Sequence, residues 1–292
     1  MRRTKLILLE GIPGSGKSTL AQTLLRDLVA QGVPARWWYE EERDHPVYVF
    51  RDQASLHKVI TALHTGRYLA VVADALDQWH TFANALQGAE EVVLLDGCLF
   101  GYLSWSLFPL AVAETEIHAY LAEVVRLLTP VAPCLIYLYQ DDIAASLHRV
   151  CSSRGTTIAQ AYIQNVEDSA YGQRDGLRGF QGLVQYWTAY RAFSDRARAA
   201  IAWPTLAVET SPTFSSAFKT SDAGRSSRYI RQTQPESAAA WPRRFQVQIA
   251  THRLGQATTE VQAQSGADPT GTDATAQQPP KPREELVASF RR

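Results

Sequence analysis

In KLILLEGIPGSGKS, at residues 5–18, a short apolar run leads into a glycine-rich loop. Residues 5–9 are apolar in the way of a buried strand, and residues 17–31 have the apolar spacing of a helix that Gly32 ends. Between them, GIPGSGKS at residues 11–18 matches the pattern G-x-x-x-x-G-K-[ST] at every fixed position. This order of strand, glycine loop and helix predicts a P-loop.

Each fixed position of the loop has a physical role in binding the phosphates of ATP or GTP. Glycines let the backbone approach an anion and turn successive amides inward as a nest. Lys17 would reach the outer phosphates, the helix that begins there adds its partial positive charge, and the Ser18 hydroxyl would ligate Mg²⁺. The candidate nucleotide-binding residues are Gly11, Gly14, Ser15, Gly16, Lys17, Ser18 and Thr19.

Strand-like and helical segments alternate over the first 210 residues. The expected strands are 5–9, 35–39, 91–95, 134–139 and 205–208, and the further helices are 54–63, 68–86, 116–128, 142–152 and 182–202. Such alternation implies a parallel sheet covered on both faces, with ligands at the carboxyl ends of the strands. We therefore expect an α/β protein with the three-layer P-loop NTPase fold, a five-stranded parallel sheet with helices on both faces.

Composition sets the organisation of the rest of the chain. We expect a P-loop kinase-like domain at 1–212 and an extension at 213–254 to which the sequence assigns no structure. Residues 255–292 form an expected disordered tail, since residues 256–281 contain no aromatic residue and almost no aliphatic residue larger than alanine. Residues 97–113 are uncharged but broken by glycine, serine and proline, which favours a covered helix or pocket wall over a membrane span.

The net charge and the number and spacing of the cysteines limit the kinds of partner and the compartment that the sequence supports. Lysine plus arginine and aspartate plus glutamate number 29 each, so nothing draws the whole molecule to nucleic acid or a membrane. Three cysteines without paired spacing, and no signal-peptide core, indicate reduced thiols in a cytoplasmic protein. The expected partners are ATP and a small-molecule acceptor, with a homodimer left open.

Companion motifs separate the classes of P-loop protein. The [NT]-K-x-D motif with which GTPase switches read the base is absent from the sequence. Asp96 closes an acidic strand and would hold Mg²⁺ with Ser18, but Gly97 follows it, where ATPase motors usually place a glutamate. A kinase is favoured over a switch or a motor.

With these motifs in place, the chain resembles the thymidylate kinase and deoxynucleoside kinase group over about residues 5–211. The match lies in IYLY at 136–139, the acidic turn at 141–142, LHR at 147–149 and the Arg154-Gly155 pair. The resemblance implies that Arg149 and Arg154 are lid arginines that stabilise the transferred group. The alternative is that both are solvated helix arginines.

Departures from this group bear on the acceptor. Asp96-Gly97 stands where thymidylate kinases have D-R, Ala73-Asp74-Ala75 stands where they have A-D-R, and residues 39–46 lack the R-E-P-G run. The arginines that grip a monophosphate are therefore missing. In deoxynucleoside kinases a glutamate after the second strand accepts the proton of a sugar hydroxyl, and Glu40 is the nearest match, with Glu42 second. An acidic solvated loop is the alternative.

The aromatic residues near this end of the sheet could contact an acceptor or belong to the core. The pocket candidates are Phe100, Tyr102 and Trp105, with Trp37, Trp38 and an orienting His45 less favoured. We expect a magnesium-dependent phosphotransferase that moves the γ-phosphate of ATP to a hydroxyl, with Lys17, Glu40, Arg149 and Arg154 as catalytic candidates. A nucleoside monophosphate kinase and a nucleotide-dependent regulatory protein are the alternatives.

Overall fold

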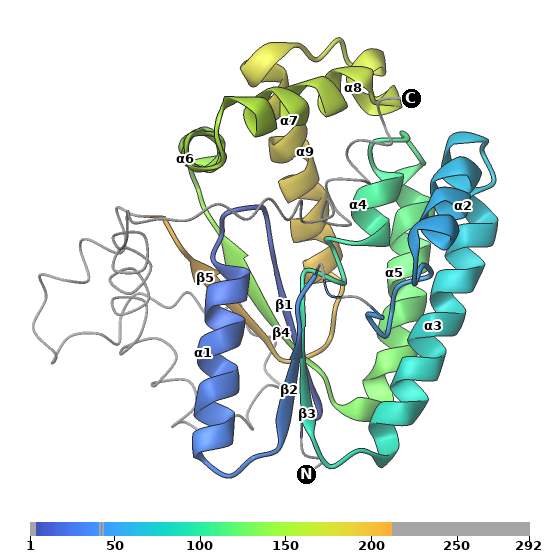
Figure 1. The fold of residues 1–292 in the computed structure, drawn as a ribbon, viewed down its shortest axis with the longest axis vertical. Coiled ribbons are helices and arrows are strands. Elements are labelled where there is room, and N and C mark those ends of the chain that lie inside the picture. Colours follow the sequence, from blue (N-terminus) through green and yellow to red (C-terminus); the bar gives the residue numbers. More distant parts are fainter. Residues whose placement is uncertain (1–3, 41, 43, 212–292) are drawn as a thin grey trace, which may run out of the picture.

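Five parallel strands form one sheet at the centre of the molecule (Figure 1). The computed structural model describes residues 4–40, 42 and 44–211. The strand order is β2-β3-β1-β4-β5, so that β1 lies in the middle, between β3 and β4. The strands are β1 (Leu6–Gly11), β2 (Ala35–Trp38), β3 (Val92–Asp96), β4 (Cys134–Tyr139) and β5 (Thr205–Glu209).

Helices cover both faces of this sheet because side chains alternate along each strand. In β1, Ile7 and Leu9 pack in a cluster with Leu24 and Leu28 of α1 (Lys17–Ala30). Leu6 and Leu8 pack in a second cluster that includes buried side chains of α3 (Tyr68–Gly88), α5 (Glu114–Leu128) and α9 (Gly179–Ala199). The result is the expected three-layer α/β P-loop fold.

Local sequence explains where several helices begin. Asp52 caps α2 (Gln53–His64) by accepting from the Ser55 amide at 2.8 Å, and Ser55 in turn binds the Asp52 amide. Asp142 caps α6 (Ile143–Arg154) through the Ala145 amide at 2.8 Å. The remaining helices are α4 (Leu103–Leu107), α7 (Thr156–Asp168) and α8 (Ala170–Arg174), with a 3-10 turn at Thr129–Val131.

Every strand and long helix expected from periodicity is present, with ends that differ by a few residues. The sequence did not predict α7 and α8, which follow α6 above the carboxyl edge of the sheet (Figure 1). The uncharged stretch 97–113 forms a loop, the short helix α4 and a turn, and its large side chains Leu99, Phe100, Leu103, Leu107 and Phe108 are buried. It is covered, as expected.

The described residues also bear on the expected state of the cysteines and on the expectation about a membrane span. All three cysteines lie among them, and none forms a disulfide. Over residues 4–40, 42 and 44–211, no helix combines the length and apolar character that a membrane crossing requires. The extension at 213–254 and the tail at 255–292 lie outside the described residues.

Candidate nucleotide and acceptor site

The P-loop connects β1 to α1 at the carboxyl edge of the sheet. Gly14 and Gly16 have φ of 80° and 93°, backbone conformations that favour glycine, so the loop depends on both residues. The Lys17 ammonium donates to the carbonyl oxygen of Gly11 at 3.1 Å and thus lies over the loop. The Ser15 amide donates within the loop, to the Ile12 carbonyl at 3.2 Å. The contact of Lys17 with the phosphates of a nucleotide stays a prediction.

Ser18 and Thr19 occupy the first turn of α1, and their exposure differs. Ser18 is half-buried and Thr19 is exposed, whereas Ser15 is buried in the loop. Asp96 ends β3 beside the loop, fully buried, in register with Leu9 of β1. No group of three or more His, Cys, Asp or Glu side chains suited to a metal occurs in the described part of the chain.

These donors fit Mg²⁺ better than an ion that needs a complete protein cage. Mg²⁺ is commonly held by one or two carboxylates together with substrate phosphates and water. Asp96 offers such a carboxylate, and Ser18 offers a hydroxyl oxygen on the helix that follows the loop. The assignment of the two residues to Mg²⁺ stays a prediction.

Glu10 is a functional candidate that the sequence reasoning missed. Its fully buried carboxylate accepts hydrogen bonds from the amides of Leu99 at 2.6 Å and Phe100 at 3.1 Å. Burial raises the pKa of Glu10 to about 7, although these two amides and Lys17 favour the charged form. The signal was present, because a glutamate that interrupts a buried strand directly before a P-loop needs a partner.

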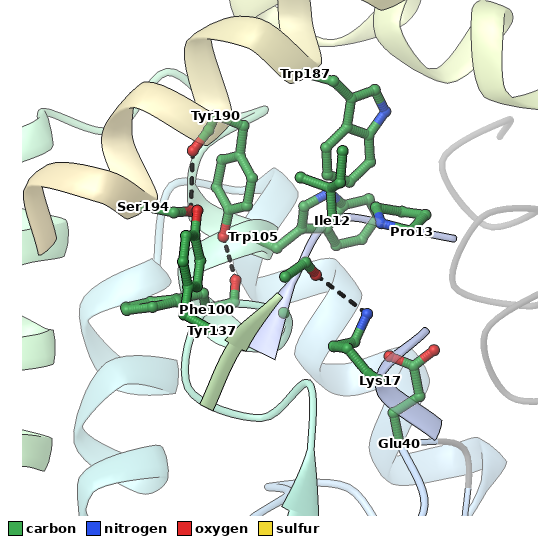
Figure 2. Close-up of a pocket in the computed structure, with 12 residues that line it drawn as sticks. Ile12, Pro13, Lys17, Glu40, Phe100, Trp105, Tyr137, Trp187, Tyr190 and Ser194 are labelled. Atoms are coloured by element: carbon green, nitrogen blue, oxygen red, sulfur yellow. Dashed lines mark hydrogen bonds between the residues drawn. The ribbon is translucent and has the colours of Figure 1, made fainter. Parts of the chain in front are cut away.

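Glu40 and Glu42 follow β2 and have different surroundings. The Glu42 carboxylate accepts from the Tyr39 amide at 3.3 Å and lies 3.6 Å from Arg36, so it is used within its own loop. Glu40 instead lines a pocket together with Lys17 (Figure 2). The structure thus brings the first candidate base, and not the second, to the P-loop.

The pocket joins this charged pair to an aromatic wall (Figure 2). Glu40 and Lys17 lie at one end, and rings from α4, β4 and α9 lie at the other. The space enclosed is about 30 Å³, enough for a water molecule, so an acceptor enters only if these side chains separate. The lining residues are Gly11, Ile12, Pro13, Lys17, Glu40, Phe100, Gly101, Trp105, Tyr137, Trp187, Tyr190 and Ser194.

Two of the three aromatic pocket candidates line this space. Phe100 and Trp105 do so, whereas the Tyr102 hydroxyl accepts from the Val49 amide at 3.0 Å and its ring packs against Tyr48. The sequence missed the contribution of α9, although Trp187, Tyr190 and Ser194 recur every three to four residues and hence share a helix face.

The other aromatic candidates lie away from the pocket lining. Trp37 packs edge-on against Tyr39, and Trp38 stacks with the guanidinium of Arg36 and contacts His45. His45 is buried and lies 3.4 Å from the Cys98 sulfur, which makes it part of the core.

The two predicted lid arginines lie at different distances from the loop along α6. Arg149 donates to the Gln140 side chain at 3.5 Å, and Gln140 in turn reaches the Gly14 carbonyl at 3.5 Å. Arg154, at the end of α6, donates to the Tyr162 hydroxyl on α7 at 2.5 Å. Arg149 therefore lies one side chain from the P-loop, and Arg154 faces the neighbouring helix.

Comparison with known proteins gives structural neighbours only. Neither a protein-family model nor a curated protein matches the sequence. The chain is similar to a deoxyadenosine kinase from M. mycoides with bound dATP, at 14% identity and TM-score 0.38, covering 70% of this chain and 91% of that one. The same kind of enzyme with bound dCTP matches at 14% identity and TM-score 0.32, over 70% and 90%.

A YorR protein from Bacillus subtilis in complex with phosphorylated GDP matches at 13% identity and TM-score 0.33, over 70% of this chain and 85% of that one. At such similarity these neighbours carry no argument about activity.

Proposed function

We propose that this protein is a magnesium-dependent phosphotransferase that moves the γ-phosphate of ATP to a hydroxyl of a small, nucleoside-like or other molecule. The observation that carries the proposal is the presence of Glu40 in the same pocket as Lys17. A cation for the donor phosphates and a carboxylate for the acceptor proton then lie at one end of one cavity.

The donor side is the P-loop. Its amides, the amino end of α1 and the Lys17 ammonium provide positive charge where the phosphates of ATP would lie. Ser18 and Asp96 would hold Mg²⁺, which when bound neutralises charge that develops on the transferred group. Arg149, one side chain from Gly14, is suited to add a further positive charge from the lid, with Arg154 behind it.

The acceptor side is the aromatic wall. Phe100 and Trp105 offer flat apolar surfaces, and the buried indole N–H of Trp105 donates no hydrogen bond within the described residues. A buried hydrogen-bond donor that has no partner in a ligand pocket is explained if the bound ligand supplies the hydrogen-bond acceptor atom. A flat molecule that carries both a hydrogen-bond acceptor and a hydroxyl fits this wall.

The reaction needs one proton acceptor. The hydroxyl group of the substrate loses its proton to the Glu40 carboxylate, while the hydroxyl oxygen forms a bond to the γ-phosphorus of ATP. The bond from that phosphorus to the bridging oxygen breaks, and ADP leaves. Glu40 then returns the proton to solvent, so atoms and charge balance.

Turnover of ATP against nucleosides, their monophosphates and simple alcohols tests the proposal. We expect ADP to form with at least one hydroxyl acceptor, and Lys17→Ala to lose ATP binding. Turnover with monophosphates alone would contradict the base assigned to Glu40 and favour a nucleoside monophosphate kinase. ATP binding without turnover of any acceptor would favour a regulatory protein.

A further inference from the structure

Gly97, directly after Asp96, lies beneath the Glu40 carboxylate. Its amide donates to the Leu9 carbonyl at 2.9 Å, which fixes it at the edge of the sheet, and its φ is 67°. A Cβ at this position would lie 2.8 Å from Oε2 of Glu40 and 3.3 Å from Cε of Lys17. The absence of a side chain at residue 97 is thus what leaves room for the carboxylate beside the lysine.

The backbone at residue 97 has no space to move away from the Glu40 carboxylate. A Cβ at Gly101 would lie 2.4 Å from the Gly97 carbonyl oxygen, so the loop already packs backbone against backbone. Glu10 holds the same loop through the Leu99 and Phe100 amides. A methyl group added at residue 97 would therefore displace the Glu40 side chain rather than the loop.

The main chain of Glu40 is also anchored. The Tyr48 hydroxyl donates to the Glu40 carbonyl oxygen at 2.7 Å. Tyr48 is itself 7% exposed, stacks on His45 with ring centroids 4.1 Å apart, and lies 4.4 Å from the Tyr102 ring. A buried aromatic stack therefore fixes the point from which the Glu40 side chain reaches the pocket.

The charges of the pocket residues bear on which acceptor the site can bind. Among the described residues that line it, Lys17 is the one cation and Glu40 the one anion, and Lys17 belongs to the P-loop. Within this described lining, the carboxylate repels the phosphate of a dianionic acceptor, since Lys17 serves the phosphates of ATP.

We infer that Gly97 is a specificity-determining position and Tyr48 a positioning residue for this site. Together they hold the Glu40 carboxylate beside Lys17, where it accepts the proton of a neutral hydroxyl and repels a phosphate. This inference rests on the proposed phosphotransfer.

The test compares Gly97→Ala with Gly66→Ala. Gly66 has a φ of 75°, close to that of Gly97, but a Cβ there would meet no atom within 4 Å, so it reproduces the backbone strain alone. For Gly97→Ala we expect kcat for the hydroxyl acceptor to fall by about 10- to 100-fold, as for other small displacements of a reacting group. The loss in kcat should exceed any loss in ATP affinity, because the added Cβ would lie closer to Glu40 than to Lys17, and Gly66→Ala should keep the wild-type kcat.

Tyr48→Phe offers a second variant without backbone strain, since it keeps the ring stack and removes only the hydroxyl, which donates to the Glu40 carbonyl and also interacts with the Cys98 side chain. Both variants are then combined with Glu40→Gln. If residues 97 and 48 act through Glu40, each should lower kcat in the wild-type background and have little effect in the Glu40→Gln background.

Three outcomes would overturn the inference. Equal kcat in Gly97→Ala and Gly66→Ala would show that the carboxylate does not depend on the missing side chain. Full additivity with Glu40→Gln would show that the two positions act by another route. Absence of turnover by the wild-type protein would remove the proposed function and this inference with it, and is recognised before any variant is made.

Discussion

Glu40 and Glu42 are two residues apart, and a sequence pattern alone cannot say which of them faces the P-loop. Three local contacts decide it in the folded chain. Glu42 turns back to the Tyr39 amide and Arg36, while Tyr48 holds the carbonyl of Glu40, whose side chain lines the pocket. The sequence could restrict the candidate base to an acidic cluster, but the contacts of Tyr39, Arg36 and Tyr48 in the folded chain decide which glutamate faces the pocket.

This difference predicts opposite results for two matched substitutions. Glu40→Gln should lower kcat by roughly 10²- to 10⁴-fold, as loss of a general base does, with ATP affinity retained. Glu42→Gln should change kcat by less than about 3-fold, because it removes only a half-exposed loop interaction. Steady-state kinetics on an acceptor identified from the panel measures both. A larger loss in Glu42→Gln would reverse the assignment.

Trp105 gives a second prediction for a single residue. Trp105→Phe keeps an aromatic surface and removes the indole donor, so KM for the acceptor should rise about 5-fold, the equivalent of one hydrogen bond. The kcat should stay nearly unchanged, since the indole does not touch the transferred group in the proposed arrangement. A fall in kcat with constant KM would argue against a ligand contact.

Two elements that enclose the site differ in how far the sequence predicts them. The helix α6 follows from its cap at Asp142 and its apolar spacing, and both lie within one short segment. The loop between β3 and α4 depends on Glu10, which lies about 90 residues earlier in the chain, and on α9, about 90 residues later. Local patterns mark Glu10 as unusual and place Tyr190 and Ser194 on one helix face, but they do not reveal the distant partners that bring these residues to the site.

The position of α6 predicts unequal roles for its arginines. Arg149→Ala should lower kcat by about 10²-fold or more, the usual effect of removing a charge that stabilises the transferred group. Arg154→Ala should have a smaller effect, because its side chain contacts Tyr162 on α7. Single-turnover rates at saturating ATP provide the comparison. Equal losses would indicate that the whole lid closes over the loop and brings both arginines to the phosphates.

Over the whole molecule, the sequence predicted the sheet, its parallel direction and its covering helices. All of these follow from local periodicity and from the P-loop, which places β1 before α1. The sequence could not supply the strand order, and with it the pairing of β1 with both β3 and β4. That order brings Asp96 and Glu40 to the P-loop, so the site is a property of the complete fold.

Two buried titratable groups, His45 and Glu10, make the stability of the fold depend on pH in opposite directions. Burial lowers the pKa of His45 from 6.5 to about 3, so the unfolded chain binds that proton more readily and stability is lost as pH falls below 6.5. Glu10 acts in the opposite sense. Its pKa is raised from 4.5 to about 7, so its contribution to stability falls as pH rises through that range.

Because the two effects oppose each other in the wild type, a substitution is needed to separate them. His45→Phe keeps a ring against Tyr48 and removes the imidazole. Between pH 6.5 and 4.5 its stability relative to the wild type should rise by about 2 to 3 kcal/mol. Urea unfolding at several pH values measures this change. A stability difference that is constant over this range would contradict the buried, neutral state of His45.

The most direct measurement of acceptor choice is ³¹P NMR of the products formed from ATP and an equimolar mixture of a nucleoside and its monophosphate. Phosphorylation of the hydroxyl gives a new phosphomonoester, and phosphorylation of the phosphate gives a diphosphate. With Glu40 beside Lys17 and no further cation in the described lining, we expect the phosphomonoester and its loss in Glu40→Gln. A diphosphate as the main product, formed equally well by Glu40→Gln, would contradict it.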